Sequence, residues 1–74
     1  MNLDFFKKNI GKTVNVNFKD GSTSNIAVYN VVGNDIIYVK NEILISINSK
    51  PINEQHEIIK NKNSHAKFNI KDVI

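Results

Sequence analysis

The side chains able to ligate a metal are two histidines and a few carboxylates, and one short segment has suggestive spacing. His56-Glu57-Ile58-Ile59-Lys60 starts like a zinc-binding helix, but a lysine stands where the second histidine ligand is needed. His56 and His65 would approach each other across a predicted last hairpin, and with Glu57 they offer three ligands for a divalent ion. Two solvent-facing histidines explain the same residues. We therefore predict neither a metal nor a cofactor.

Catalytic residues are not arranged in any motif that an enzyme of known chemistry requires. The three glycines are too far apart in the sequence to form either type of glycine-rich phosphate-binding loop. The serines within residues 22–24 follow a predicted hairpin turn, whereas a nucleophile elbow lies between a strand and a helix. Asp20 and Asp35 fall in predicted turns, where aspartate normally serves turn geometry. The sequence predicts a protein that is not an enzyme.

Lysine is the residue type that points to a ligand. The formal net charge is +3, the pI is about 9.3, and all ten basic residues are lysines. Lysine acts as a point charge, so nucleic-acid binding by this chain would be electrostatic, sensitive to salt and weakly selective for sequence. An A+T-rich genome would by itself enrich lysine, asparagine and isoleucine.

The candidate nucleic-acid-binding residues combine lysines with aromatic rings that can stack on bases. The predicted binding set is Lys12, Lys19, Tyr29, Asn34, Tyr38, Lys40 and Lys71. A wider set of candidates adds Phe5, Lys60, Lys62 and Lys67. The alternative interpretation is that the two tyrosines are wall residues with a solvated hydroxyl and that the lysines only cover a solvent-exposed face.

The length of 74 residues predicts one domain, 1–74, with a marginal core. There is no cysteine, so disulfides and thiolate metal sites are excluded. A small core then gains stability by burying surface against another chain, and we expect a homo-oligomer or a protein partner. The longest purely apolar run covers only residues 36–39, and no secretory signal is visible. We therefore predict no membrane partner and a cytoplasmic location.

Turn signals and hydrophobic alternation place the elements of the first half. Asn2 can cap a short helix that ends at Gly11. Residues 13–19 alternate as a half-buried strand, and Asp20-Gly21 predicts a type I′ hairpin turn. A longer strand over residues 22–32 and a turn at Gly33-Asn34 lead into a third strand over residues 35–40.

The second half is also predicted to be mainly β. Residues 42–47 form a fourth strand, residues 48–55 a loop, and residues 57–60 and 66–70 a last hairpin, followed by a 3₁₀-like turn over 71–74. The predicted fold is all-β: a small, strongly bent antiparallel barrel with a short N-terminal helix. Its interior would hold six side chains, namely Val14, Val16, Phe18, Ile43, Ile45 and Phe68.

Residues 6–21 carry a resemblance to a known family. The run from Gly11 to Gly21 reads Gly-Lys-Thr-Val-Asn-Val-Asn-Phe-Lys-Asp-Gly, and it resembles the first motif of Sm-like proteins, including the bacterial Hfq-type members. SH3-like barrels produce a similar pattern. The resemblance implies a small barrel that binds RNA. The chain departs from the family pattern with Ile26 in place of a glycine, at residues 32–36 in place of an Asp-x-x-x-Asn loop, and with Lys71-Asp72 in place of a Lys-His pair.

These observations predict a non-enzymatic binding module. The leading hypothesis is a Sm-like small barrel that binds RNA or single-stranded nucleic acid through lysines. The alternative is a protein–protein interaction module, either an adaptor or an inhibitor from a phage or a mobile element, that uses an exposed strand edge. The positive charge favours the first hypothesis, whereas the absence of arginine and the altered base-binding loop favour the second.

Overall fold

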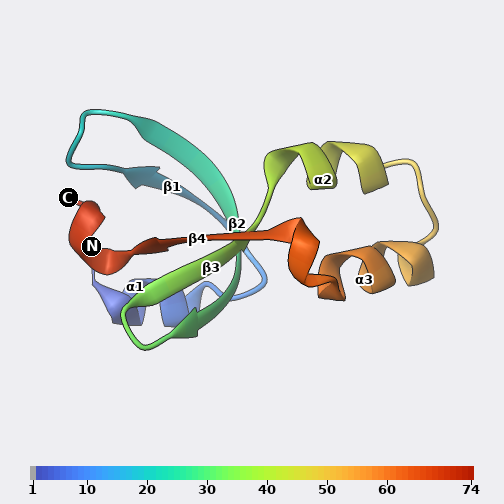
Figure 1. Ribbon diagram of the computed structural model, residues 1–74, viewed down its shortest axis with the longest axis horizontal. Coiled ribbons are helices and arrows are strands. Elements are labelled where there is room, and N and C mark those ends of the chain that lie inside the picture. The colour runs from blue at the N-terminus through green and yellow to red at the C-terminus, as the bar shows by residue number, and fades with distance from the viewer. Residues whose placement is uncertain (1) are drawn as a thin grey trace.

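The computed structural model describes residues 2–74 and contains one antiparallel sheet with three α-helices (Figure 1). The sheet has the order β1-β2-β3-β4, with β1 Thr13–Asn17, β2 Thr23–Val32, β3 Asp35–Val39 and β4 His65–Asn69. The α-helices are α1 Leu3–Lys8, α2 Asn41–Ile47 and α3 Ile52–Lys60. Two 3₁₀ turns flank β4, namely η1 Lys62–Ser64 and η2 Ile70–Asp72.

The predicted N-terminal helix is confirmed as α1, but it ends at Lys8 with Asn9 as its C-cap and does not extend to Gly11 as predicted. The side chain of Asn2 accepts a hydrogen bond from the Phe5 amide at 3.1 Å, which satisfies one of the free N–H groups of the first turn. A six-residue helix is not stable alone in water, so α1 depends on docking its apolar face. Phe6 supplies that contact, because it is fully buried and meets Phe68 edge-to-face with ring centroids 5.9 Å apart.

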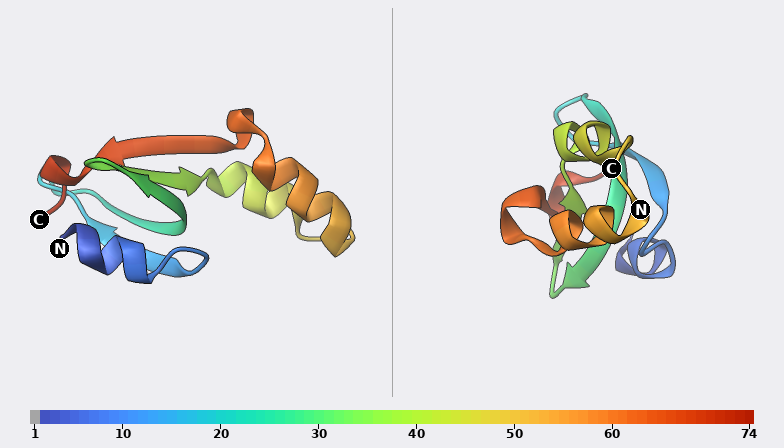
Figure 2. Two further views of the ribbon diagram at one scale, coloured as in Figure 1. Left: turned by 90° about the horizontal axis from the view of Figure 1, so that it is seen from below. Right: turned by 90° about the vertical axis from the view of Figure 1, so that its right-hand side faces the viewer.

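The core lies between α1 and the concave face of the sheet. The sheet curls, so α1 and β4 lie on opposite sides of the core (Figure 2). The predicted alternation of β1 is confirmed, since Val14 and Val16 are buried while the residues between them are exposed. The buried cluster consists of Phe6, Val14, Val16, Ile26, Val28, Ile36 and Val73.

The hairpin turn after β1 is confirmed, but its type is not the predicted I′. Gly21 has a φ of +91°, whereas Asp20 does not have a positive φ, so only one centre is left-handed. The Phe18 amide donates to the Ser22 carbonyl at 2.9 Å and the Gly21 amide donates to the Phe18 carbonyl at 3.0 Å. This pattern is a three-residue loop in which only the last position, Gly21, is left-handed.

The predicted all-β barrel is wrong. The sheet is open, and the chain is 38% helical and 37% strand. After β4 the chain only touches the far edge of the sheet: Phe18 and Val73 form an isolated bridge, and the Lys19 amide donates to the Asp72 carbonyl at 2.9 Å. The strand that would have completed the barrel is absent because the residues assigned to it are helical.

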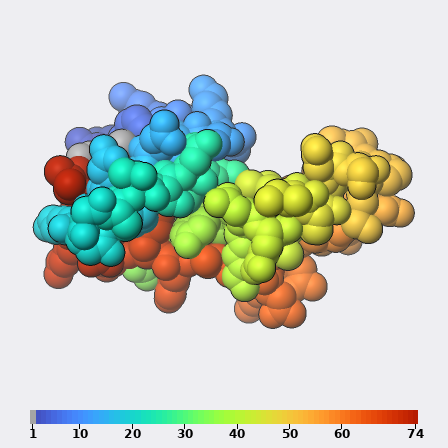
Figure 3. All heavy atoms as spheres, turned by 90° about the horizontal axis from the view of Figure 1, so that it is seen from above, coloured from blue at the N-terminus to red at the C-terminus, as the bar shows by residue number. Residues whose placement is uncertain are grey.

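Residues 41–60 form a helical hairpin that projects beyond the end of the sheet (Figure 1). It replaces the predicted strand over residues 42–47, the loop over 48–55 and the strand over 57–60. Ile43 and Ile45 were expected in one interior with Val14, but Ile43 is only half-buried and Ile45 is 77% exposed, whereas Ile47 is buried. In the space-filling view of Figure 3 the hairpin is a narrow extension of a broader body.

Candidate nucleic-acid interface

The convex face of the sheet carries a pair of stacked rings. Directly opposed residues of antiparallel strands share a face of the sheet. Val28 belongs to the buried core and Tyr38 is opposite Val28, so Tyr38 lies on the core face. The next residue of β2, Tyr29, therefore lies on the convex face, at a register shift between Val28 and Asn30 that interrupts the pairing. The Tyr29 and His65 rings lie 4.1 Å apart between centroids with an interplanar angle of 33°. Tyr29 is 36% exposed, so its ring is accessible to a ligand.

His65 is held in place by the end of α3. Its Nε2 lies 2.5 Å from the Ile59 carbonyl oxygen, and since a carbonyl only accepts, Nε2 is the nitrogen that carries the proton. The Ser64 hydroxyl donates to the Ile58 carbonyl at 2.7 Å. The Ile58 carbonyl also accepts from the Asn61 amide at 3.1 Å, so the Ser64 bond is its second, while the His65 bond gives the Ile59 carbonyl in the last turn of α3 a partner. They also fix the His65 ring against Tyr29 before any ligand arrives.

A shallow hollow of about 420 Å³ lies next to this ring pair, and we call it the basic hollow. Its lining residues come from β3, η1 and β4 and are Ile37, Lys62, His65, Ala66 and Lys67. The lining is mostly apolar, with two lysines and, within the described part of the chain, no carboxylate. A hollow with this composition offers positive charge beside an apolar floor.

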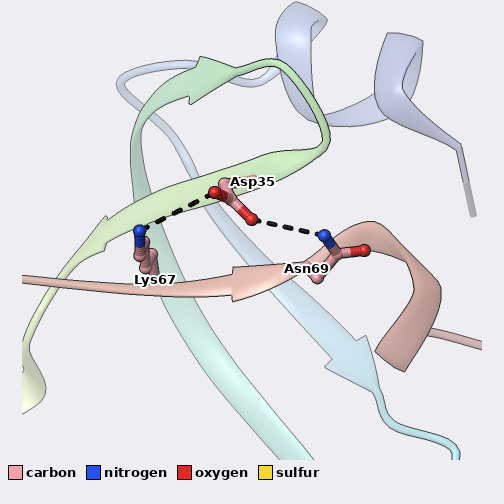
Figure 4. A network of polar contacts seen from close by, with 3 residues as sticks. All are labelled: Asp35, Lys67 and Asn69. Carbon is pink, nitrogen blue, oxygen red and sulfur yellow. Dashed lines mark hydrogen bonds and ion pairs between the residues drawn. The ribbon is translucent and has the colours of Figure 1, made fainter.

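Asp35 partly balances one of the two lysines. Its carboxylate lies 3.8 Å from the Lys67 ammonium and accepts a hydrogen bond from the Asn69 side-chain amide at 3.4 Å (Figure 4). Lys67 is 69% exposed, so water and salt screen this ion pair and its energy is small. Lys67 therefore remains available to an anion that approaches from solvent.

A second hollow, of about 470 Å³, lies at the other end of the sheet, and we call it the aromatic hollow. It is lined by Phe18, Lys19, Asp20, Phe68 and Asp72. Hydrogen bonds from the Ser22 hydroxyl and amide favour the charged form of Asp20 and lower the pKa of its carboxyl below the usual 3.8. Two carboxylates against one lysine make this hollow unsuitable for a polyanion.

A third hollow, of about 300 Å³, lies on α3, and we call it the acidic hollow. It is lined by Asn53, Glu54, Glu57 and Ile58. Of the three hollows described, only the basic hollow has a lining suited to an anionic ligand.

The structure brings only part of the predicted binding set together. Tyr29 flanks the basic hollow through its contact with His65. Lys40 is half-buried, and its amide donates to the Ser64 carbonyl at 2.9 Å, beside the start of β4. Tyr38 is on the opposite face of the sheet, half-buried against Phe68 with ring centroids 5.7 Å apart. The two tyrosines therefore do not form one stacking surface.

The other predicted residues are scattered. Lys12 is exposed just before β1, where its backbone pairs with Val28. Asn34 is in the β2–β3 turn, where its carbonyl accepts from the Ile70 amide at 2.8 Å. Lys19 is exposed in the loop after β1, beside the η2 segment that carries Lys71. Lys19 and Lys71 share their end of the sheet with Asp20 and Asp72, whereas Lys12 lies at the other end of β1.

Sequence reasoning missed how the basic hollow is assembled. Lys62 and Lys67 were only in the wider candidate set, His65 was treated as a metal-ligand candidate, and Ile37 was assigned to no site. A signal for Ile37 and Lys67 existed, because a β3–β4 pairing places them opposite each other. Finding Lys62 required knowing that η1 lies beside that pair.

The metal hypothesis has no support from the described residues, which contain no group of three or more histidines, cysteines or carboxylates placed to hold an ion. His56 is exposed on α3, and His65 is bound to a carbonyl. Over residues 2–74 no helix has both the length and the apolar character to span a membrane. Comparisons of the chain with protein-family models, curated proteins and solved structures find no match. The resemblance to Sm-like proteins stays a prediction.

Proposed function

We propose that this chain is a non-enzymatic module that binds RNA or another single-stranded nucleic acid beside the basic hollow. The observation that carries the proposal is the position of the exposed Tyr29–His65 ring pair next to a hollow with two lysines, Lys62 and Lys67. A base would stack on the ring pair while the lysines neutralise neighbouring phosphates. A cytoplasmic site of action, as the sequence predicts, is part of this proposal.

Selectivity for base sequence is expected to be low. Lysine contacts to phosphate carry no sequence information, and an aromatic ring stacks on any base. The apolar floor around Ile37 favours an unpaired strand, because the edges and faces of its bases are free to contact it. The expected ligand is a short single-stranded segment, bound with a strong dependence on salt.

The test is a fluorescence-anisotropy titration of labelled oligo-U with the intact protein at several salt concentrations. The Lys62→Gln/Lys67→Gln variant should bind more weakly, and its plot of log K against log salt should be shallower by about 1.4, since each phosphate neutralised on a single strand contributes about 0.7. The matched control is Lys19→Gln/Lys71→Gln, which loses the same charge beside the aromatic hollow at the other end of the sheet and should retain the wild-type slope.

Two results would contradict the proposal. One is the absence of any anisotropy change at micromolar wild-type protein and low salt. The other is an equal loss for the two double variants, because that would mean that binding follows net charge rather than the basic hollow.

A second candidate function, protein binding by strand addition, is favoured by the edge position of β4. The Lys40 amide bonds to the Ser64 carbonyl and the Ile70 amide bonds to the Asn34 carbonyl, so by antiparallel alternation the backbone groups of Lys67 point away from β3. Lys67 is also a residue type that blocks unwanted pairing at an edge. This candidate would lead if oligo-U does not bind.

A further inference from the structure

Helix α3 is amphipathic, yet none of its residues is buried. Ile52 is 64% exposed, and Ile58 is half-buried and lines the acidic hollow together with Glu54 and Glu57. A nine-residue helix is too short to be stable by itself, so its apolar side needs a contact that one copy of the chain provides only in part. The acidic hollow therefore combines one apolar side chain, Ile58, with two carboxylates.

The acidic and basic hollows are neighbours on the same molecule. The Ser64 hydroxyl bonds to the Ile58 carbonyl, and the His65 ring bonds to the Ile59 carbonyl, so the last turn of α3 lies against the start of β4. Ile58 lines the acidic hollow and His65 lines the basic one. In Figure 1 the chain passes from α3 through a tight turn into β4 at this point.

The two hollows are also complementary in charge. Glu54 and Glu57 line the first, and Lys62 and Lys67 line the second. The apolar lining is Ile58 in the first and Ile37 and Ala66 in the second. A two-fold interface must be self-complementary, and two neighbouring patches of opposite charge meet that condition when the rotation brings each patch of one copy against the other patch of its mate. A patch with carboxylates alone would repel its own copy in the same arrangement.

We propose that the occupant of the acidic hollow is a second copy of this chain, bound in a two-fold dimer in which α3 of each copy docks on the basic hollow of the other. The glutamates then take the place of phosphates. Self-association and nucleic-acid binding therefore exclude each other, because both occupy the basic hollow. This mutual exclusion rests on the proposed function. The dimer itself depends only on charge and apolar contact between the two hollows.

Sedimentation velocity over a range of protein concentrations tests the dimer. Glu57→Lys and Lys62→Glu should each weaken association by at least about tenfold, because each places like charges together across the interface. In the proposed dimer Glu57 of one copy faces Lys62 of the other. The Glu57→Lys/Lys62→Glu variant reverses both of these charges and should restore association. Glu42→Lys and Lys8→Glu change the net charge by the same amounts outside both hollows and should associate like wild type. Circular dichroism would confirm that every variant is folded.

The outcomes separate the two proposals. A wild-type protein that stays monomeric up to millimolar concentration, or a charge swap that fails to restore association, overturns the dimer whether or not oligo-U binds. If the swap restores association but saturating oligo-U leaves the dimer intact, mutual exclusion is overturned and the basic hollow is not the nucleic-acid site. If oligo-U converts dimer to monomer, both proposals are supported.

Discussion

Replacing Tyr29 by leucine should weaken nucleic-acid binding without changing its dependence on salt. The Tyr29 ring is 36% exposed and stacked on His65 at 4.1 Å, so it presents a fixed flat surface on the convex face. Loss of a stacking aromatic costs about 1–3 kcal/mol per base on substitution by alanine. Leucine keeps part of the apolar contact, so the expected cost is about 1–2 kcal/mol, which is a loss of about 5- to 30-fold in affinity.

The assay is the oligo-U anisotropy titration at several salt concentrations, with unfolding in urea as a check on stability. Loss of the ring pair should lower the free energy of unfolding by about 0.5–1.5 kcal/mol, which leaves the protein folded. The control is Tyr38→Phe, which removes only a hydroxyl on the opposite face and should bind like wild type. An unchanged affinity for Tyr29→Leu, or a salt slope that falls with the affinity, would refute the stacking role.

Three further predictions concern the Asp35–Lys67 ion pair, the core residue Phe6 and the turn residue Asp20. Asp35→Asn removes the carboxylate 3.8 Å from the Lys67 ammonium, and it should tighten oligo-U binding by up to about fivefold in the same titration. Phe6→Ala should cost about 3–5 kcal/mol of the roughly 4–11 kcal/mol expected for a domain of this size, measured by urea unfolding. The lowered pKa of Asp20 means that its stabilising effect is present above pH 3.8 and is lost as the pH falls through the folded-state pKa. Asp20→Asn should therefore lose less stability than wild type between about pH 5 and about pH 3.

The first half of the fold follows from local signals in the sequence. The cap at Asn2, the alternation around Val14 and Val16 and the glycine at position 21 are each satisfied by the structure, because each depends on a few neighbouring residues. The type of the turn was wrong because Asp20-Gly21 also suits a three-residue loop with a single left-handed position.

The second half could not be assigned in the same way. Four of the five residues from Ile43 to Ile47 are apolar, and such a run fits a two-residue repeat as well as a helical one. The β-branched isoleucines favoured a strand, whereas the structure buries Ile47, half-buries Ile43 and exposes Ile45, as a helix does. Residues 42–47 were assigned a two-residue repeat and therefore a strand. That extra strand led to the prediction of a closed barrel, whereas the structure is an open sheet with a helical insertion.

The candidate site was predictable only as a collection of residue types. Tyr29 was in the predicted binding set and its ring is exposed, but its contact with His65 depends on a β3–β4 pairing whose strands are separated by the whole helical insertion. Tyr38 was in the same predicted set but lies on the other face of the sheet, because one position along a strand decides which face a side chain occupies. Charge in the sequence favoured a nucleic-acid ligand but could not place the basic hollow.

The most direct test of the account is a titration of ¹⁵N-labelled protein with oligo-U, followed by backbone amide chemical shifts. We predict that the largest shifts cluster at Tyr29, Ile37 and residues 62–67. The largest shifts at Lys12, Lys19 or Lys71, or no shifts at all at millimolar oligo-U, would contradict the assignment of nucleic-acid binding to the basic hollow.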